Sequence, residues 1–489
     1  MPRPPSRQPN QKKPSKALAK VVADPAPMNI ITAFDDPDLF GKFFVGDSWN
    51  GWRSVLKAAF ALPMTPTDTA FFKSVAGDRD MPTEAVREFW AVVGRRGGKD
   101  SVTSAIAAFT AATFTGHAKL RPGERALVMC LAVDREQAKV LLNYCRSYFT
   151  DVDLLKGMLT RETAIGFELN NSVDIQILTG NFRSVRGRAV LLAVLDEVAF
   201  LRDENSAAPD QELYKAIVPG TATLGGMIIG ISSPYRKSGL LFKKHKKHFG
   251  QNDDVLVIQA ATRVLNPTIP QSMIDRELAD DPAGSRAEYL AEFRDDIGGW
   301  LAIETIEAAV DRGVTVRPPA TAVHKYRAAC DPSGGSKDSF TAAVAHDEQG
   351  AAVLDCLIEI KPPFNPAEAV AQIAAMLRAY GLSETTGDRY AAEWVVSAFA
   401  SNGILYRHSE RDRSAIYQDC LPLFTSGRAR ILDHQKLVSQ FAQLERKISP
   451  MGKDRIDHGQ GGHDDLCNSA ALAMVLATTV PKFRGLLFG

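Results

Sequence analysis

The chain has 489 residues, 45% of them hydrophobic and 24% charged, and its formal net charge is +1. This length exceeds the size at which one hydrophobic core stops growing, so we expect two or three domains of ordinary globular composition. The small net charge excludes nucleic-acid binding through a global electrostatic field, so any such binding must use local basic patches. No apolar run in the sequence approaches membrane-spanning length, and prolines follow the basic start, so we expect an intracellular protein without a membrane partner.

The first 45 residues are rich in proline and begin with a basic stretch. Eight prolines occur by Pro37, and six lysines or arginines precede the first acid, Asp24. Such a segment cannot bury a core, so we expect a disordered arm over residues 1–45. A solvated tail is its simpler interpretation, and a docking arm for DNA or a partner protein is the alternative.

Strand-like apolar runs alternate with helical patterns between about Trp49 and Trp300. This alternation predicts an α/β fold with a doubly wound, mostly parallel sheet, which we assign to residues 46–310. The predicted strands are Ala91–Val93, Ala126–Leu131, Val173–Leu178, Val190–Leu195, Met227–Ile231 and Val255–Gln259.

The prolines of Arg317–Ala320 interrupt this pattern and predict a linker over residues 311–324. Residues 325–489 then begin with three closely spaced strands, which indicate an antiparallel meander. A helix, a short strand and a closing helix of small residues follow, and this order is that of an RNase H-like nuclease. The predicted elements are strands at Tyr326–Cys330, Phe340–Ala345 and Ala352–Ile358, a helix at Pro366–Tyr380, a strand ending near Asp388, and a helix at Asp464–Thr478.

A glycine-rich turn ending in lysine follows the first predicted strand. It comprises Gly94, Arg95, Arg96, Gly97, Gly98, Lys99, Asp100 and Ser101. Backbone N–H groups of such a turn, placed before a helix, cradle phosphates, and the lysine adds a point charge. The turn departs from the usual P-loop pattern twice, because Val93 stands where the first glycine belongs and Asp100 replaces the Ser or Thr that binds Mg²⁺. Ser101 could substitute for that hydroxyl.

An Asp-Glu pair and a Ser-Ser pair end two further predicted strands of the first sheet. Asp196 could hold Mg²⁺ and Glu197 could activate water, which would complete an ATP-hydrolysing core. Ser232 and Ser233 could sense the γ-phosphate and pass its loss to neighbouring elements. The structural alternatives are helix capping for the acids and an ordinary Ser-Pro turn for the serines.

Two basic segments are candidates for contacts with phosphates. The arginines of Asn181–Arg188 could contact DNA or reach the γ-phosphate bound by a neighbouring subunit. The run Lys243–His248 could contact DNA phosphates. A solvated surface is the simpler interpretation of both segments.

A second set of acids lies in the last third of the chain. Asp331 ends a predicted strand, Asp388 follows another, and Asp464 and Asp465 open the last helix. Carboxylates so placed can converge on two Mg²⁺ or Mn²⁺ ions, which clamp the attacking and leaving oxygens of a phosphodiester. Either Asp464 caps the helix and Asp465 binds metal, or the reverse. Asp338 and Glu393 are reserve candidates.

Taken in order, these motifs resemble the large terminase subunit of tailed bacteriophages, the motor-nuclease that packages DNA into procapsids. The resemblance implies an N-terminal P-loop ATPase domain of the ASCE type that translocates double-stranded DNA. It also implies a C-terminal RNase H-like nuclease domain that cuts concatemers. The motifs that carry it are Gly94–Lys99, Arg186-Gly187, Leu195–Glu197, Ser232–Pro234, Asp331, Gly387–Trp394 and His463–Leu466.

The resemblance further implies cofactors, partners and residue roles. The cofactors would be ATP and Mg²⁺, with Mn²⁺ possible at the nuclease site. The partners would be double-stranded DNA, a portal protein, a small terminase subunit and further copies in a ring on the portal, in the host cytoplasm. Lys99 would bind phosphate, Asp196 the metal, and Glu197 the attacking water, while Ser232 and Ser233 would couple hydrolysis to movement. The nuclease metals would be held by Asp331, Asp388 and Asp464 or Asp465.

Three other classes of protein remain as alternatives. A helicase or other translocating ATPase would need the first constellation but not the second set of acids. An RNase H-like recombinase or integrase would need the acids but not Lys99. A structural, portal-associated protein with decayed sites would turn over no ATP, and Asp100 is the one feature in its favour.

Overall fold

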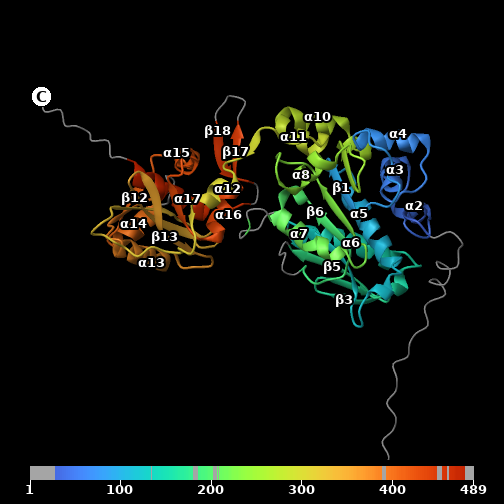
Figure 1. Ribbon diagram of the computed structural model, residues 1–489, viewed down its shortest axis with the longest axis horizontal. Helices are drawn as coiled ribbons and strands as arrows, with labels where there is room; N and C mark the ends of the chain where they lie inside the picture. The colour runs from blue at the N-terminus through green and yellow to red at the C-terminus, as the bar shows by residue number, and fades with distance from the viewer. Residues whose placement is uncertain are drawn as a thin grey trace, which may run out of the picture. The chain divides into compact units, whose positions relative to one another are not determined.

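The computed structural model describes most of the chain as two compact units (Figure 1). Unit 1 comprises Met1–Leu201 and Ala208–Arg294, and unit 2 comprises Arg202–Ala207 and Asp295–Gly489. The described residues are 28–133, 135–179, 185–201, 206, 209–336, 338–387, 393–448, 454–459 and 462–479. No helix among them is both long and apolar enough to cross a bilayer.

Unit 1 is built on an eight-stranded sheet in the order β3-β4-β5-β2-β6-β7-β1-β8. Six of its strands pair in parallel and are almost fully buried, as expected where helices cover both faces of a sheet. All six predicted strands are present, so the doubly wound sheet is confirmed. Their bounds are Glu88–Val93 (β1), Ala126–Ala132 (β2), Val173–Thr179 (β5), Val190–Asp196 (β6), Met227–Ser232 (β7) and Val255–Ala260 (β8), and the unpredicted antiparallel edge is Leu159–Thr163 (β3) and Gly166–Leu169 (β4).

One strand, β7, lies between β1 and β6, so the strand before the glycine-rich turn is not adjacent to the strand that ends in Asp-Glu. This insertion is the arrangement expected of an ASCE-type P-loop ATPase. Because the three strands are parallel, their carboxyl ends meet at one edge of the sheet, where ligands bind in open α/β folds. The longer helices of unit 1 are Asn50–Ala59 (α3), Pro66–Val75 (α4), Lys99–Ala112 (α5), Arg135–Asp151 (α6), Pro209–Thr221 (α7), Gly239–His248 (α8), Gln271–Asp280 (α10) and Pro282–Leu290 (α11).

Residues 28–45 form ordered structure, contrary to the disordered arm expected over residues 1–45. A short helix, α2 (Ile30–Asp35), is capped by the side chain of Asn29, which accepts hydrogen bonds from two backbone amides of the helix. Phe34 is buried and stacks on Phe44 with ring centroids 4.0 Å apart. The apolar side chains between the prolines therefore join the core of unit 1. Residues 1–27 lie outside the described part of the chain.

Unit 2 contains a seven-stranded sheet in the order β10-β16-β13-β12-β11-β14-β15. Strands β11, β12 and β13 form the predicted antiparallel meander, and β14 and β15 continue it in parallel from β11. This is the strand order of an RNase H-like fold, as predicted. The strands are Val310–Asp311 (β10), Tyr326–Asp331 (β11), Phe340–Glu348 (β12), Ala351–Ile360 (β13), Glu384–Gly387 (β14), Leu405–His408 (β15) and Ala429–Leu432 (β16).

The last helix, α17, packs on the central strands β11, β12 and β13 and on α15 (Figure 1). Its small residues allow this close approach, and most of its side chains are buried. A separate three-stranded sheet lies in the same unit. The helices are Pro366–Ala379 (α13), Glu393–Ser401 (α14), Arg413–Thr425 (α15), Gln435–Gln443 (α16) and Asp465–Thr478 (α17), and the small sheet contains Ile297–Gly299 (β9), Leu444–Ile448 (β17) and Asp454–His458 (β18).

The boundary between the units lies at Arg294, not at residue 310 as expected. Strand β9 pairs with β17, and β10 pairs with β16, so residues 297–311 belong to unit 2. The expected linker over residues 311–324 also packs on unit 2, because Arg317 donates hydrogen bonds to Asp311 and to the carbonyl of Leu354. The prolines that suggested a linker therefore lie in an ordered connection.

Candidate active sites

The glycine-rich turn connects β1 to α5 in a conformation that requires small residues. A Cβ atom on Gly94 would lie 2.5 Å from Thr262 Oγ1 and 2.8 Å from the backbone nitrogen of Thr262, so only glycine fits there. Gly98 and Arg96 both have positive φ angles, of 86° and 64°. The late position of the first glycine is thus explained by the close approach of the chain at Thr262.

The turn is held by three side chains from two other segments of the chain. Trp52 Nε1 donates to the carbonyl of Gly97, Thr262 Oγ1 to that of Arg95, and Asn266 Nδ2 to that of Arg96, each at 2.8 Å. These bonds occupy carbonyl groups, whereas the first amides of a helix have no partner within the helix and can receive an anion. Residues Lys99, Asp100 and Ser101 form the first turn of α5, and Arg95 and Arg96 are exposed.

Lys99 is buried and paired with Glu197. Its Nζ lies 3.0 Å from Glu197 Oε1, and Ser232 Oγ donates to Glu197 Oε2 at 3.0 Å. Burial alone would lower the pKa of Lys99, but the carboxylates of Glu197 and Asp100 raise it above its ordinary value. Glu197 has a φ of 46°, an uncommon conformation for a residue with a side chain, and such strain occurs at functional sites. Ser233 is buried next to Ser232.

Asp196 and Asp100 each have a buried oxygen without a hydrogen-bond partner, the Oδ1 atom in both cases. Burial, and then the charges of Asp100 and Glu197, raise the pKa of Asp196 to about 8. Burial also raises the pKa of Asp100, against the opposing effect of Lys99. Unpartnered carboxylate oxygens at this position suit a hard divalent cation, so the donor set fits Mg²⁺.

In unit 2, β11 places Asp331 at its carboxyl end, where Asn468 Nδ2 donates to Asp331 Oδ2 at 2.8 Å. Burial raises the pKa of Asp331 to about 7; Asn468 and Arg413 lower it, while Asp465 and Asp464 raise it further. The hydrogen bond from Asn468, a residue of the first turns of α17, therefore joins Asp331 to the helix that begins at Asp465.

The expected third position, Asp388, lies outside the described residues. The strand before it, β14, ends at Gly387, which pairs with Cys330, the residue before Asp331. Across the described ranges, no group of three or more His, Cys, Asp or Glu side chains is arranged to hold a metal ion. Of the reserve candidates, Asp338 and Glu393 are both exposed.

Asp464 and Asp465 differ in their partners. Asp464 is 2% exposed and accepts hydrogen bonds from Arg413 Nη1 at 3.0 Å and from the Tyr417 hydroxyl at 2.9 Å. It makes no side-chain cap on α17, so the capping role considered for it is wrong. Asp465 is half-buried, and burial followed by the charge of Asp464 raises its pKa. The oxygens of Asp464 are thus engaged by protein donors, which leaves Asp465 as the better metal-ligand candidate.

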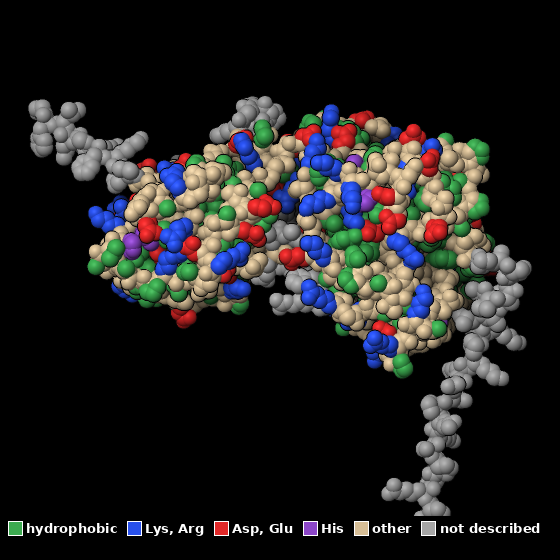
Figure 2. Space-filling model, in the orientation of Figure 1, with side chains coloured by type: hydrophobic (Ala, Val, Ile, Leu, Met, Phe, Trp, Pro, Cys, Tyr) green, Lys and Arg blue, Asp and Glu red, His purple; other side chains and the backbone are tan. Residues whose placement is uncertain are grey.

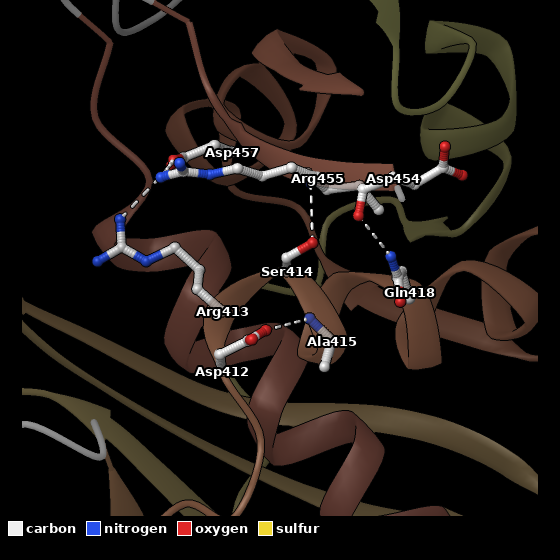
Figure 3. Close-up of a pocket in the computed structure, with 9 residues that line it drawn as sticks. Asp412, Arg413, Ser414, Ala415, Gln418, Asp454, Arg455 and Asp457 are labelled. Atoms are coloured by element: carbon white, nitrogen blue, oxygen red, sulfur yellow. Dashed lines mark hydrogen bonds and ion pairs between the residues drawn. The ribbon is translucent and has the colours of Figure 1, made fainter. Parts of the chain in front are cut away.

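A cavity of about 640 Å³ lies between the start of α15 and β18 (Figure 3). Arg413 lines it, and its Nη1 is 3.9 Å from Asp457 Oδ1 and 3.0 Å from Asp464 Oδ1. Arg455 approaches the same Asp457 at 2.9 Å. Arg413 therefore connects the acid cluster of α17 with this cavity.

A second cavity, of about 610 Å³ in unit 1, is lined by five cationic side chains and one acid. Arg186 and Arg188 of the predicted basic segment belong to it. The other predicted basic run forms most of α8 and is partly structural, since Lys244 pairs with Glu88 at 2.5 Å. Acidic and basic side chains are mixed on the visible surface of both units, as the small net charge requires (Figure 2). The charged residues of the cavity are Lys119, Arg121, Glu124, Arg186, Arg188 and Lys215.

Sequence reasoning missed the residues that organise these acids. Asn468 lies three positions after Asp465 on the same helix, so helical spacing could have indicated it. Arg413 and Tyr417 precede Asp464 by 51 and 47 positions, and no local pattern connects them to it.

No protein-family model matches this chain, and no curated protein matches it. Among solved structures, the HK97 bacteriophage large terminase matches with 14% identity and a TM-score of 0.38, over 88% of this chain and 100% of that one. A large terminase from a thermophilic bacteriophage matches with 11% identity and a TM-score of 0.39, over 88% of this chain and 98% of that one.

The large terminase nuclease from thermophilic phage G20c matches with 18% identity and a TM-score of 0.30, over 35% of this chain and 95% of that one. These values are too low to carry an argument about function, which rests instead on the two sites and the two strand orders. The chain is thus similar, over most of its length, to bacteriophage large terminases.

Proposed function

We propose that this protein is a large terminase subunit, which uses ATP to move double-stranded DNA into a procapsid and cuts concatemeric DNA with a metal-dependent nuclease. The observation that carries the proposal is the occurrence of two different acid clusters in one chain. One surrounds a P-loop lysine at the edge of an ASCE-type sheet, and the other lies at the centre of an RNase H-like sheet. A helicase would lack the second cluster, and a recombinase would lack the first.

In the proposed ATPase site, the backbone amides at the start of α5 and the ammonium of Lys99 bind the β- and γ-phosphates. Mg²⁺ held by Asp196 would neutralise charge that develops on the phosphates. Glu197 accepts a proton from the attacking water once the phosphates draw Lys99 away from it. Ser232, which donates to Glu197, ends β7 and so connects the γ-phosphate position to the centre of the sheet.

In the proposed nuclease site, Asp331 and Asp465, together with Asp388, would hold Mg²⁺ or Mn²⁺. These ions would activate water and stabilise the leaving oxygen of the phosphodiester. Asp464 acts as a positioning residue, because its bonds to Arg413 and Tyr417 fix the start of α17 and thereby the backbone that carries Asp465. The hydroxyl of Thr341 also donates a hydrogen bond to the backbone carbonyl of Asp465 at 2.6 Å.

Double-stranded DNA is the proposed substrate of both sites. The basic cavity of unit 1, with Arg186 and Arg188, is a candidate for contact with its phosphates. A portal protein, a small terminase subunit and a homo-oligomeric ring in the host cytoplasm belong to the same proposal.

The test is to measure ATP hydrolysis and cutting of linear double-stranded DNA for the wild type, Lys99→Ala and Asp331→Asn. We expect Lys99→Ala to abolish ATP turnover and to leave Mg²⁺- or Mn²⁺-dependent cutting intact, and Asp331→Asn to do the reverse. Cutting that survives Asp331→Asn would contradict the proposed nuclease site. No cutting by the folded wild type with either metal would favour a plain translocating ATPase. ATP turnover that survives Lys99→Ala would contradict the proposed P-loop.

A further inference from the structure

We propose that Asp100 and Asp196 together form a two-carboxylate cation site, which binds Mg²⁺ or Mn²⁺ before the nucleotide arrives. This inference rests on the proposed ATPase function and concerns the order in which metal and ATP bind. In a P-loop with Ser or Thr after the lysine, one neutral hydroxyl and one acid face the cation. In this chain, a second carboxylate takes the place of the hydroxyl.

The first support is the state of the two carboxylates. Asp196 is 8% exposed, and its Oδ1 atom is buried without a hydrogen-bond partner. Asp100 lies in the first turn of α5, and its Oδ1 atom is also buried without a partner. A buried carboxylate oxygen without a donor is costly, so two of them in one site indicate that a cation normally completes it.

The second support is the local charge. The carboxylates of Asp100, Asp196 and Glu197 interact electrostatically with one another and with the ammonium of Lys99. Lys99 Nζ forms an ion pair with Glu197 Oε1 at 3.0 Å, and the neighbouring Arg96 side chain is exposed to solvent. Three carboxyl groups share one buried ammonium, so a divalent cation that displaces protons from Asp100 and Asp196 would offset the repulsion among the resulting carboxylates.

The third support is coordination chemistry. Mg²⁺ in proteins is typically bound by one or two carboxylates, keeps several waters, and takes its remaining ligands from substrate phosphates. Asp100 and Asp196 supply the carboxylates, and the amides at the start of α5 would receive the phosphates. Ser101 is the competing ligand; successive helical residues do not share a face, so it and Asp100 do not take the same role.

Two consequences distinguish this site from a hydroxyl-containing P-loop. First, the protein should bind a divalent cation without nucleotide, because the site supplies two carboxyl ligands of its own. Second, Mn²⁺ alone should stabilise the protein, because an ion that binds only the folded state raises its stability.

The experiment measures Mn²⁺ binding to the full-length protein without nucleotide, by electron paramagnetic resonance of free Mn²⁺. All variants carry Asp331→Asn, which disables the proposed nuclease site. In this background we expect one bound Mn²⁺ per chain. Asp100→Asn or Asp100→Ser should lower the Mn²⁺ affinity about tenfold or more, because ligand charge sets affinity. Asp275→Asn should leave the affinity unchanged. Asp275 is a matched control, since it is an exposed aspartate of α10 in the same unit.

A second readout keeps the test valid if a variant folds poorly. Mn²⁺ should raise the unfolding temperature of the background protein and of Asp275→Asn, but not that of Asp100→Asn. Binding unaffected by Asp100→Asn, or lost in Ser101→Ala instead, would overturn the inference.

The proposed function is checked separately by ATP hydrolysis with Mg²⁺. Hydrolysis by a protein that binds no Mn²⁺ without nucleotide would overturn the inference and leave the ATPase proposal standing. Absence of hydrolysis by the wild type would overturn both.

Discussion

Each of the two acid clusters contains an aspartate at the end of a strand. The clusters differ in the basic side chain that pairs with one of their acids. Asp196 and Asp331 each end a buried strand near the middle of a sheet, and the pKa of each is raised by burial. In unit 1 the buried cation is Lys99, which pairs with Glu197 through a single contact of 3.0 Å. In unit 2 the cation is Arg413, whose side chain is 39% exposed and contacts both oxygens of Asp464 at 3.0 and 3.3 Å.

This difference separates an exchangeable pair from a fixed one. Lysine is a compact charge on a flexible stem, so phosphates can replace Glu197 as the ion-pair partner of Lys99. Arginine presents a rigid planar fork, and Tyr417 also donates to Asp464, so that carboxylate is held from two sides. Under the proposed function, the first cluster would rearrange during a nucleotide cycle, and the second would keep its geometry while a phosphodiester is cut.

The largest effect is expected for Glu197→Gln. The amide cannot accept the proton of the attacking water, so ATP turnover should fall about a thousandfold, while ATP binding is retained. Steady-state hydrolysis and equilibrium binding of a fluorescent ATP analogue measure the two quantities. Glu292→Gln, on an exposed side chain of the same unit, serves as the control. Turnover within tenfold of the wild type would contradict the role of Glu197 as base.

Asp465→Asn should lower metal-dependent DNA cutting about a hundredfold or more, because loss of an outer partner alone costs about 10–100-fold and Asp465 is proposed to touch the metal. ATP hydrolysis should not change. Cutting of linear DNA over a range of Mn²⁺ concentrations measures the effect. If Asp464→Asn were more damaging to cutting than Asp465→Asn, the assignment of the two residues would have to be exchanged.

Asp464→Asn should instead act on stability. Replacing a charged acceptor of one buried and one partly buried hydrogen bond by a neutral amide should lower the free energy of unfolding by about 2 kcal/mol. Urea denaturation followed by circular dichroism measures this loss. Asp457→Asn is the matched control, since its 3.9 Å contact with Arg413 is longer and should contribute less. Equal losses of unfolding free energy in the two variants would show that Asp464 is not the more strongly held partner of Arg413.

The smallest effect is expected for Ser232→Ala. Removing one hydrogen bond to the carboxylate of Glu197 should slow ATP turnover about tenfold, because such a bond to a charged group contributes about 1.5 kcal/mol. Ser233→Ala should have less effect, since the contact with Glu197 belongs to Ser232. A larger loss of ATP turnover in Ser233→Ala than in Ser232→Ala would assign the coupling role to Ser233 instead.

Much of the fold could be predicted because buried strands leave a clear pattern. Strand β6, for example, is a continuous apolar run that ends in an acid, and it was predicted within one residue of its observed end. The short strands β9 and β10 could not be predicted, because two or three residues carry no periodicity. The domain boundary was misplaced for the same reason, since prolines near residue 318 gave a stronger signal than these strands.

The sequence by itself determined which residue types stand at strand ends and helix starts, because local hydrophobic patterns and turn residues specify where an element begins and ends. It therefore selected Lys99, Asp196 and Glu197 as candidate site residues in one domain, and Asp331 and the Asp464–Asp465 pair in the other. Only the tertiary structure decided which strands are neighbours and which side chains pair. The partners of Asp464 and the unpartnered state of Asp100 arise from elements distant in sequence, and local physics carries no information about contacts made across a packed core.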